Sequence, residues 1–254
     1  AHGSFGYTHK QKEILTRALR IQEQHYGPNH PTIASTLVEL AKAYGSDNDR
    51  MMLMLREALK IQEQHYGPDH PEVASTLVEL ANAHSSVSDA PIKKNLLEKA
   101  LKVQEQHYGP EHPKVASTLV ELANAHGSLD DAHTLQQMLE RALTIQEQHY
   151  GPDHPDVAST LVNMANAKGS FGDIHTEKRM LERALQIQEE HYGPDHHKVA
   201  STLVSLANAH GSLDDTSTMQ RMLERALEIQ ERHYGPDHPE VASTLVKLAN
   251  VPNQ

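Results

Sequence analysis

The tripeptide His-Tyr-Gly returns along the chain at a nearly constant spacing, and this period limits the possible folds more than any other feature. Its copies begin at His25, His65, His107, His149, His191 and His233, so neighbouring copies lie 40 residues apart once and 42 residues apart four times. The two missing residues fall between Gly45 and Met51, where one linker is shorter. Self-similarity at a period of about 20–50 residues is typical of solenoid proteins.

Each repeat contains two segments with the apolar periodicity of an α-helix. The first reads VASTLVELANA at residues 115–125, and its buried side is expected to hold Val115, Leu119, Leu122 and His126. The second covers residues 135–150. Its expected inner face holds Leu135, Met138, Leu139, Ala142, Leu143 and Gln146. The sequence therefore predicts an all-α fold of twelve alternating helices joined by short loops.

The joints between these segments carry residues that end one helix and begin the next. In the HYGPDHP motif, Gly151 suits a left-handed residue at a helix end, and Pro152 cannot continue the helix. Asp153 or His154 then caps the following helix, whose first turn accommodates Pro155. These signals predict an antiparallel turn at each copy of the motif.

The pattern ALxIQE followed by GPDHPxVASTLxxLA resembles the tetratricopeptide repeats of the kinesin light chain type. The residues that carry the resemblance are Ala142, Leu143, Ile145, Gly151, Asp153, His154, Pro155, Val157, Ala158, Leu161 and Ala165. The resemblance implies an α-solenoid, a right-handed superhelix of antiparallel helix pairs in which the first helix of each pair lines a concave groove. It also implies that the protein binds peptides or proteins and is not an enzyme.

The repeats extend over the whole chain, so we expect residues 1–254 to form a single solenoid of about six units of 40–42 residues. Residues 1–15, AHGSFGYTHKQKEIL, align with residues 167–181, AKGSFGDIHTEKRML. Ala1 therefore corresponds to a position inside a repeat. This alignment predicts that the chain is a fragment of a longer protein.

Composition excludes several function classes. The formal net charge of −11 would repel a nucleic-acid backbone, and the sequence has no Trp to stack on bases. No apolar run approaches the roughly 20 residues that span a bilayer. The chain has no Cys, which removes thiolate chemistry and is compatible with the cytoplasmic location that we expect.

The twenty histidines raise the question of a metal site. Equivalent histidines of successive repeats should lie about one helix spacing apart, roughly 8–10 Å, which is too far for them to share one metal ion. Helix capping already explains His154, and the Tyr residues of His-Tyr-Gly are expected to pack helix ends. The pair Asp130 and Asp131 follows the helix stop at Gly127 and also suits capping. We therefore expect no metal, no cofactor and no catalytic residues.

Polar residues recur on the opposite side of each first helix, in three columns one helical turn apart. The columns contain an invariant Ser, a variable middle residue and a recurrent Asn. Asn stabilises a helix interior less than Ala does, so its recurrence suggests a role other than helix formation. Asn offers both a donor and an acceptor to an extended peptide. The predicted binding residues are Ser75, Glu79, Asn82, Ser117, Glu121, Asn124, Asn163, Asn166, Ser205, Asn208, Lys247 and Asn250.

The middle column is acidic in the first three repeats, neutral in the next two and basic in the last. This gradient predicts a peptide or protein partner with a basic segment. The alternative function is a structural array that assembles head to tail, because a second helix at the start of the chain and a first helix at its end would each expose an apolar stripe. The sequence thus predicts a protein-interaction scaffold or a self-assembling array.

Overall fold

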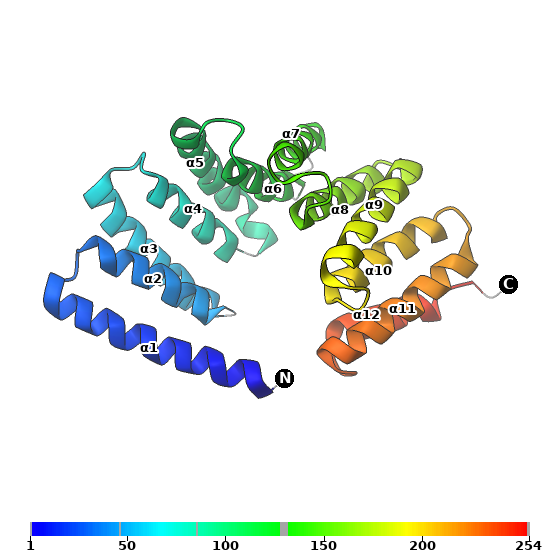
Figure 1. The fold of residues 1–254 in the computed structure, drawn as a ribbon, viewed down its shortest axis with the longest axis horizontal. Helices are drawn as coiled ribbons and strands as arrows, with labels where there is room; N and C mark the ends of the chain where they lie inside the picture. The colour runs from blue at the N-terminus through cyan, green and yellow to red at the C-terminus, as the bar shows by residue number, and fades with distance from the viewer. Residues whose placement is uncertain (1, 46, 85, 128–131, 253–254) are drawn as a thin grey trace. The chain divides into compact units, whose positions relative to one another are not determined.

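The computed structural model describes residues 2–45, 47–84, 86–127 and 132–252 (Figure 1). Every regular element within them is helical, which confirms the all-α class and the twelve α-helices. These are α1 His2–Tyr26, α2 Pro31–Tyr44, α3 Asn48–Tyr66, α4 Pro71–Ala83, α5 Ala90–Tyr108, α6 Pro113–Gly127, α7 Ala132–Tyr150, α8 Pro155–Ser170, α9 Ile174–Tyr192, α10 His197–Gly211, α11 Thr216–Tyr234 and α12 Pro239–Ala249. A short 3₁₀ helix, η1, covers Val87–Asp89.

The chain divides into two compact units, Ala1–Asp131 and Ala132–Gln254. The first contains α1 to α6 and the second contains α7 to α12. Within each unit, consecutive helices run antiparallel and pack against one another (Figure 1). We call α2, α4, α6, α8, α10 and α12 the A helices, and α1, α3, α5, α7, α9 and α11 the B helices. Stacked A–B pairs in each unit give the solenoid architecture that the period predicts.

The HYGPDHP corners end the B helices with a backbone that only glycine adopts easily. Gly193 has φ 87° and ψ 160°, and its N–H still donates to the Glu189 carbonyl at 3.0 Å. Gly151 has φ 91°, so the predicted positive φ is confirmed. The ψ value at Gly193, however, belongs to the extended positive-φ region and not to the left-handed helical region that the sequence suggested.

Histidine, not the preceding acidic residue, caps the A helices. His154 Nδ1 accepts from the backbone N–H of Asp156 at 3.2 Å. The ring of Tyr150 stacks on His154 with 4.3 Å between centroids, and Tyr66 stacks on His70 at 4.4 Å. The Tyr side chains therefore pack helix ends, as predicted, and hold the capping imidazole in position.

At the other joint, aspartate side chains cap α3, α9 and α11, whereas Asp89 before α5 makes no such hydrogen bond. Asp173 Oδ1 accepts from the Thr176 N–H at 3.2 Å, and Asp215 Oδ1 accepts from the Thr218 N–H at 3.1 Å. The end of α6 at Gly127 agrees with the prediction. Asp130 and Asp131 lie outside the described residues. The repeat equivalents of Asp131, Asp173 and Asp215, have the predicted capping role, whereas those of Asp130, Gly172 and Asp214, are turn residues with positive φ.

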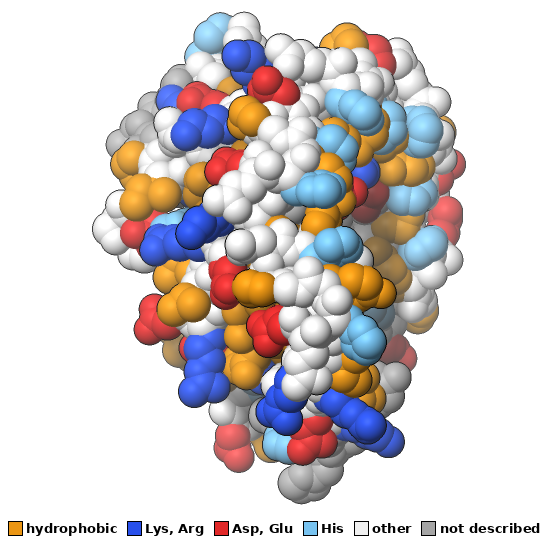
Figure 2. Space-filling model, turned by 90° about the vertical axis from the view of Figure 1, so that its left-hand side faces the viewer, with side chains coloured by type: hydrophobic (Ala, Val, Ile, Leu, Met, Phe, Trp, Pro, Cys, Tyr) orange, Lys and Arg blue, Asp and Glu red, His pale blue; other side chains and the backbone are white. Residues whose placement is uncertain are grey.

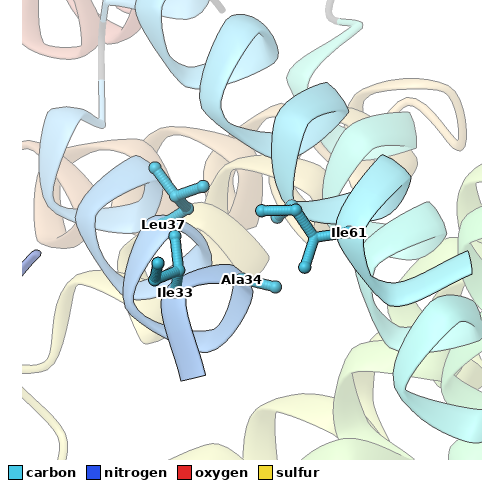
Figure 3. Close-up of a cluster of buried hydrophobic side chains, with 5 residues drawn as sticks. Ile33, Ala34, Leu37 and Ile61 are labelled. Carbon is cyan, nitrogen blue, oxygen red and sulfur yellow. The ribbon is translucent and has the colours of Figure 1, made fainter. Parts of the chain in front are cut away.

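The core is a series of similar clusters between paired helices. In one cluster Ile33, Ala34 and Leu37 of α2 pack against Ala58 and Ile61 of α3, all at most 4% exposed (Figure 3). Alanines at the contact allow the two helix backbones to approach closely. Val115, Leu119 and Leu122 are likewise buried on α6, whereas the side chain of His126 is outside the described set.

The expected inner face of α7 is largely correct. Leu139, Ala142 and Gln146 are buried, whereas Leu135, Met138 and Leu143 are half-buried. The prediction omitted Ile145, which is only 1% exposed. Ile145 lies beside the predicted apolar stripe of α7. The buried face of this helix is therefore wider than that stripe.

A buried hydrogen bond joins each of several B helices to the next A helix. Thr202 Oγ1 donates to Gln188 Oε1 at 2.7 Å, and Thr244 makes the same bond with Gln230 at 2.7 Å. In the third repeat the equivalent Thr118 is also buried, but Gln104 Oε1 has no hydrogen-bond partner in the structure. The equivalent Thr and Gln residues are therefore hydrogen-bonded to each other in some repeats and not in this one.

This difference predicts unequal effects for one substitution. Thr202→Val should lower the free energy of unfolding by about 1–3 kcal/mol, because it leaves the buried Gln188 carbonyl without its donor. Thr118→Val, at an equally buried position with no bond to Gln104, should have a clearly smaller effect. Urea unfolding followed by circular dichroism measures both. Equal losses in the two variants would contradict the assigned role of the Thr202–Gln188 bond.

Candidate binding surface

The predicted polar columns lie on the accessible side of the A helices, opposite the buried Val, Ala and Leu residues. The Asn column is exposed at every described position of the prediction: Asn82, Asn124, Asn166, Asn208 and Asn250. Ser117 is also exposed, and the remaining predicted residues are half-buried: Ser75, Glu79, Glu121, Asn163, Ser205 and Lys247. All twelve side chains are therefore arranged so that a ligand could reach them within each unit.

Contacts between neighbouring A helices show that the columns lie side by side. Lys42 Nζ of α2 is 3.3 Å from Glu79 Oε1 of α4. Lys247 Nζ of α12 donates to Asn208 Oδ1 of α10 at 3.4 Å. Burial works against the charged form of Lys42, but the Glu79 and Glu39 carboxylates outweigh it and raise the pKa of Lys42. Adjacent repeats thus form a continuous polar surface within each unit.

The Ser column has a local structural role. Ser75 Oγ donates to the Pro71 carbonyl at 3.1 Å, and Ser117 Oγ donates to the Pro113 carbonyl at 3.2 Å. Each hydroxyl hydrogen is therefore used within its own helix, and only the oxygen lone pairs remain for a ligand. Helix geometry accounts for part of the invariance of this column.

The B helices also contribute to this surface, which the sequence did not predict. Lys93 Nζ of α5 lies 3.2 Å from Glu121 Oε2 of α6. The equivalent of Lys93 on α9 is Glu177, whose side chain is only 9% exposed. Among the described residues, no hydrogen bond or ion pair reaches its carboxylate, and burial raises its pKa. An alignment of the repeats contains a signal for this site, because Glu177 is the one acidic residue in its column.

Glu177 lies in an open pocket of about 420 Å³. Three helices of the second unit form it, namely α8, α9 and α10, together with Ser212 directly after α10. Its lining residues are Asn166, Gly169, Ser170, Ile174, Glu177, Asn208, Ala209 and Ser212. The pocket therefore brings two residues of the predicted Asn column together with an unpaired carboxylate.

Sequence models described as tetratricopeptide repeat match the chain at residues 115–190 and at residues 52–72, 73–114 and 199–240. The chain belongs to the tetratricopeptide repeat family. Proteins of this family are generally non-enzymatic, and the tetratricopeptide fold supports a general role as a protein-interaction scaffold. A comparison with curated protein sequences gives no match.

Solved structures share this tetratricopeptide fold at low sequence identity. BtubC (BKLC) from P. vanneervenii is 22% identical over 91% of this chain and 94% of its own, with a TM-score of 0.73. Nearly identical TPR-like repeats from Podosopora anserina, whose structure carries the name of a kinesin light chain, are 23% identical over 81% of this chain and 98% of theirs, with a TM-score of 0.64. A Rap protein in complex with competence and sporulation factor is 15% identical over 98% of this chain and 72% of its own, with a TM-score of 0.64. At these identities the likeness concerns the fold alone.

Many histidine side chains lie at the surface of this tetratricopeptide protein (Figure 2). Among the residues that the structure describes, no three His, Asp or Glu side chains converge in a way that could hold a metal ion. None of the described helices has the length and apolar character needed to cross a membrane.

One corner differs from the others because His197 replaces the proline at the first position of an A helix. The His197 ring lies 4.2 Å from the His196 ring and 4.6 Å from the His233 ring. Burial lowers the pKa of His196 and His197, and neighbouring positive charge, from Lys198 among others, lowers both further. His196 Nδ1 must be unprotonated to accept from the Lys198 N–H, at 3.3 Å.

These lowered pKa values predict that stability falls as the solution becomes more acidic. Below the ordinary histidine pKa of 6.5, the unfolded chain binds more protons at these positions than the folded chain. The free energy of unfolding should therefore decrease between about pH 7 and about pH 5. The variant His196→Asn with His197→Pro keeps a capping side chain and removes both imidazoles, so its decrease should be smaller. Urea unfolding across this range measures both proteins, and identical pH profiles would contradict the prediction.

Proposed function

We propose that this protein is an interaction scaffold that binds an extended peptide segment of a partner along the polar surface of the A helices. The observation that carries the proposal is the exposed Asn column, which recurs on α4 and α6 in the first unit and on α8, α10 and directly after α12 in the second, on the side opposite the core. An Asn side chain can donate to a peptide carbonyl and accept from a peptide N–H. A column of such residues therefore matches the repeating polar groups of an extended backbone.

The contacts change the expected charge preference of this surface. Glu79 and Glu121 are acidic members of the middle column, but each already lies within 3.3 Å of a lysine Nζ. Part of their charge is therefore compensated inside the protein. The unpaired carboxylate of Glu177 is the stronger feature that would favour a basic residue in the bound segment.

Removing two neighbouring Asn side chains tests this proposal. Asn166→Ala with Asn208→Ala should weaken the binding of peptides selected on the wild-type protein from a random linear library by about tenfold, since each lost hydrogen bond contributes about 0.5–1.5 kcal/mol. Calorimetric titration measures the change. Gln148→Ala, at an exposed position of the B helix α7, is the matched control and should leave binding unchanged. Unchanged binding in the double variant would remove these residues from the binding surface.

Head-to-tail self-assembly is a second candidate, favoured by two apolar faces. Ile21 of α1 is 48% exposed, whereas its repeat equivalent Ile187 is 3% exposed. Leu245 of α12 is 46% exposed, whereas its equivalent Leu203 is 2% exposed. Ile14 also lines an open cavity of about 390 Å³ beside α2. Contact between the α1 face of one copy and the α12 face of another would bury both and would generate an open array.

Charged substitutions on these two faces test the assembly. If the faces associate, the weight-average mass in sedimentation equilibrium should increase with protein concentration, and Ile21→Glu or Leu245→Glu should each return the protein to a monomer. Peptide binding by the A helices should be retained in both variants. A wild-type protein that stays monomeric at high concentration would reject self-assembly and leave the peptide-binding proposal intact.

A further inference from the structure

We propose that the pocket between α8, α9 and α10 binds one cationic side chain, a lysine ammonium or an arginine guanidinium, with Glu177 as its counter-ion. This inference rests on the proposed function, because it assigns the cation to the extended peptide bound by the A helices. It specifies that one residue of that peptide is Lys or Arg, and that this residue is bound in the pocket at Glu177.

The first support is the burial of an unpaired carboxylate. Glu177 is 9% exposed and lines a pocket of about 420 Å³, within the range of about 300–1,000 Å³ typical of ligand pockets. A buried charge without a partner is unfavourable, so such groups normally have an ion pair or several hydrogen bonds. No partner for this carboxylate exists in the described part of the chain. A cation from a ligand would supply one.

The second support is the fit between Glu177 and Gly169. A Cβ atom added at Gly169 would overlap the Glu177 carboxylate, so the absence of a side chain on α8 leaves the space that the carboxylate occupies. In the next pair, Met219 takes the equivalent place beside Gly211, with its sulfur 2.7 Å from a Cβ built there. An apolar side chain therefore satisfies the packing at this position.

The third support is that no other repeat has an acidic residue at the position of Glu177. The equivalent positions of the other repeats hold Gln11, Met51, Lys93, Leu135 and Met219. Stability alone would favour Met or Leu, since ionised Glu177 is destabilised by burial. The acidic residue in this repeat is therefore better explained by a ligand than by the core.

The remaining polar groups of the pocket also favour a ligand that carries only donors. The Ser170 hydroxyl donates to the Asn166 carbonyl at 3.0 Å and the Ser212 hydroxyl donates to the Asn208 carbonyl at 3.1 Å, so both hydroxyl oxygens keep lone pairs. The amide oxygen of Asn208 already accepts from the Lys247 ammonium at 3.4 Å, so Asn208 offers its N–H donors to a carbonyl of the peptide backbone and not to the cation. Lysine and arginine side chains have donors and no acceptors, which matches the two hydroxyl oxygens and the Glu177 carboxylate.

A metal ion fits the pocket less well. Calcium takes about six to eight oxygen ligands, commonly with several carboxylates, whereas Glu177 is the one acidic side chain among the lining residues. An organic cation needs fewer ligands and gains from the open side of the pocket, through which a peptide side chain could enter. The geometry therefore favours ammonium or guanidinium.

The experiment uses small probes and the full chain. N-acetyl-lysine amide and N-acetyl-arginine amide are titrated into the protein, with N-acetyl-citrulline amide as the neutral match of arginine and with CaCl₂ and MgCl₂ as separate arms. The readouts are the carboxyl ¹³C resonance of Glu177 and the side-chain amide resonances of Asn166 and Asn208. We expect saturable shifts with the lysine probe, the arginine probe or both, and no saturation with citrulline or with the metal ions.

Two variants make the result specific. Glu177→Gln keeps the shape and removes the charge, and Glu177→Met introduces the residue type found at position 219. Both should bind the cationic probes at least tenfold more weakly, and neither should lower the unfolding midpoint at neutral pH. Equal binding by Glu177→Gln, equal shifts with citrulline, saturation by a metal ion, or no saturable shift with either cationic probe would each overturn the proposal.

A parallel selection separates this proposal from the function on which it rests. Random linear peptides are selected on the wild-type protein and on Glu177→Gln. Peptides that require Asn166 and Asn208 but show no enrichment of Lys or Arg would overturn the pocket assignment and support peptide binding by the A helices. Cationic probes that saturate the pocket, without any selected peptide, would support the pocket and reject the extended-peptide function.

Discussion

The close contact between paired helices, made by buried alanines, is the interaction on which the rest of the structure depends. In the second unit, Ala158 of α8 and Ala184 of α9 are both fully buried in one cluster, and Ala200 and Ala226 repeat the arrangement in the next pair. Small side chains at this contact fix the distance between the helices, and the branched residues beside them fill the remaining space. Because each A helix is oriented by this contact, its Ser, middle and Asn columns must face away from the core.

The corners and the buried hydrogen bonds then set the register of one pair against the next. A glycine with positive φ, a histidine cap and a Tyr–His stack recur in the HYGPDHP motif, so each B helix passes to the following A helix through a similar turn. The Thr202–Gln188 bond adds a directional contact inside the apolar core. The second histidine of the motif thus has a structural role as a helix cap, and the proposed binding chemistry lies on the polar surface of the A helices.

Local chemistry explains why much of this fold could be predicted from the sequence. Helix periodicity, the glycine corner and the buried stripe at Val115, Leu119 and Leu122 are all properties of neighbouring residues. The ion pair between Lys42 and Glu79 and the pocket at Glu177 depend on which helices meet in space, so periodicity did not reveal them. The exposed positions of the Asn column could be predicted, but their role in binding stays a proposal.

The most direct test of the account is a crystal structure of the protein with a peptide selected from a random linear library. The account predicts that the peptide lies extended along the A helices, with hydrogen bonds from its backbone to the side chains of the Asn column. A peptide bound instead to the HYGPDHP corners or to the outer faces of the B helices would contradict it.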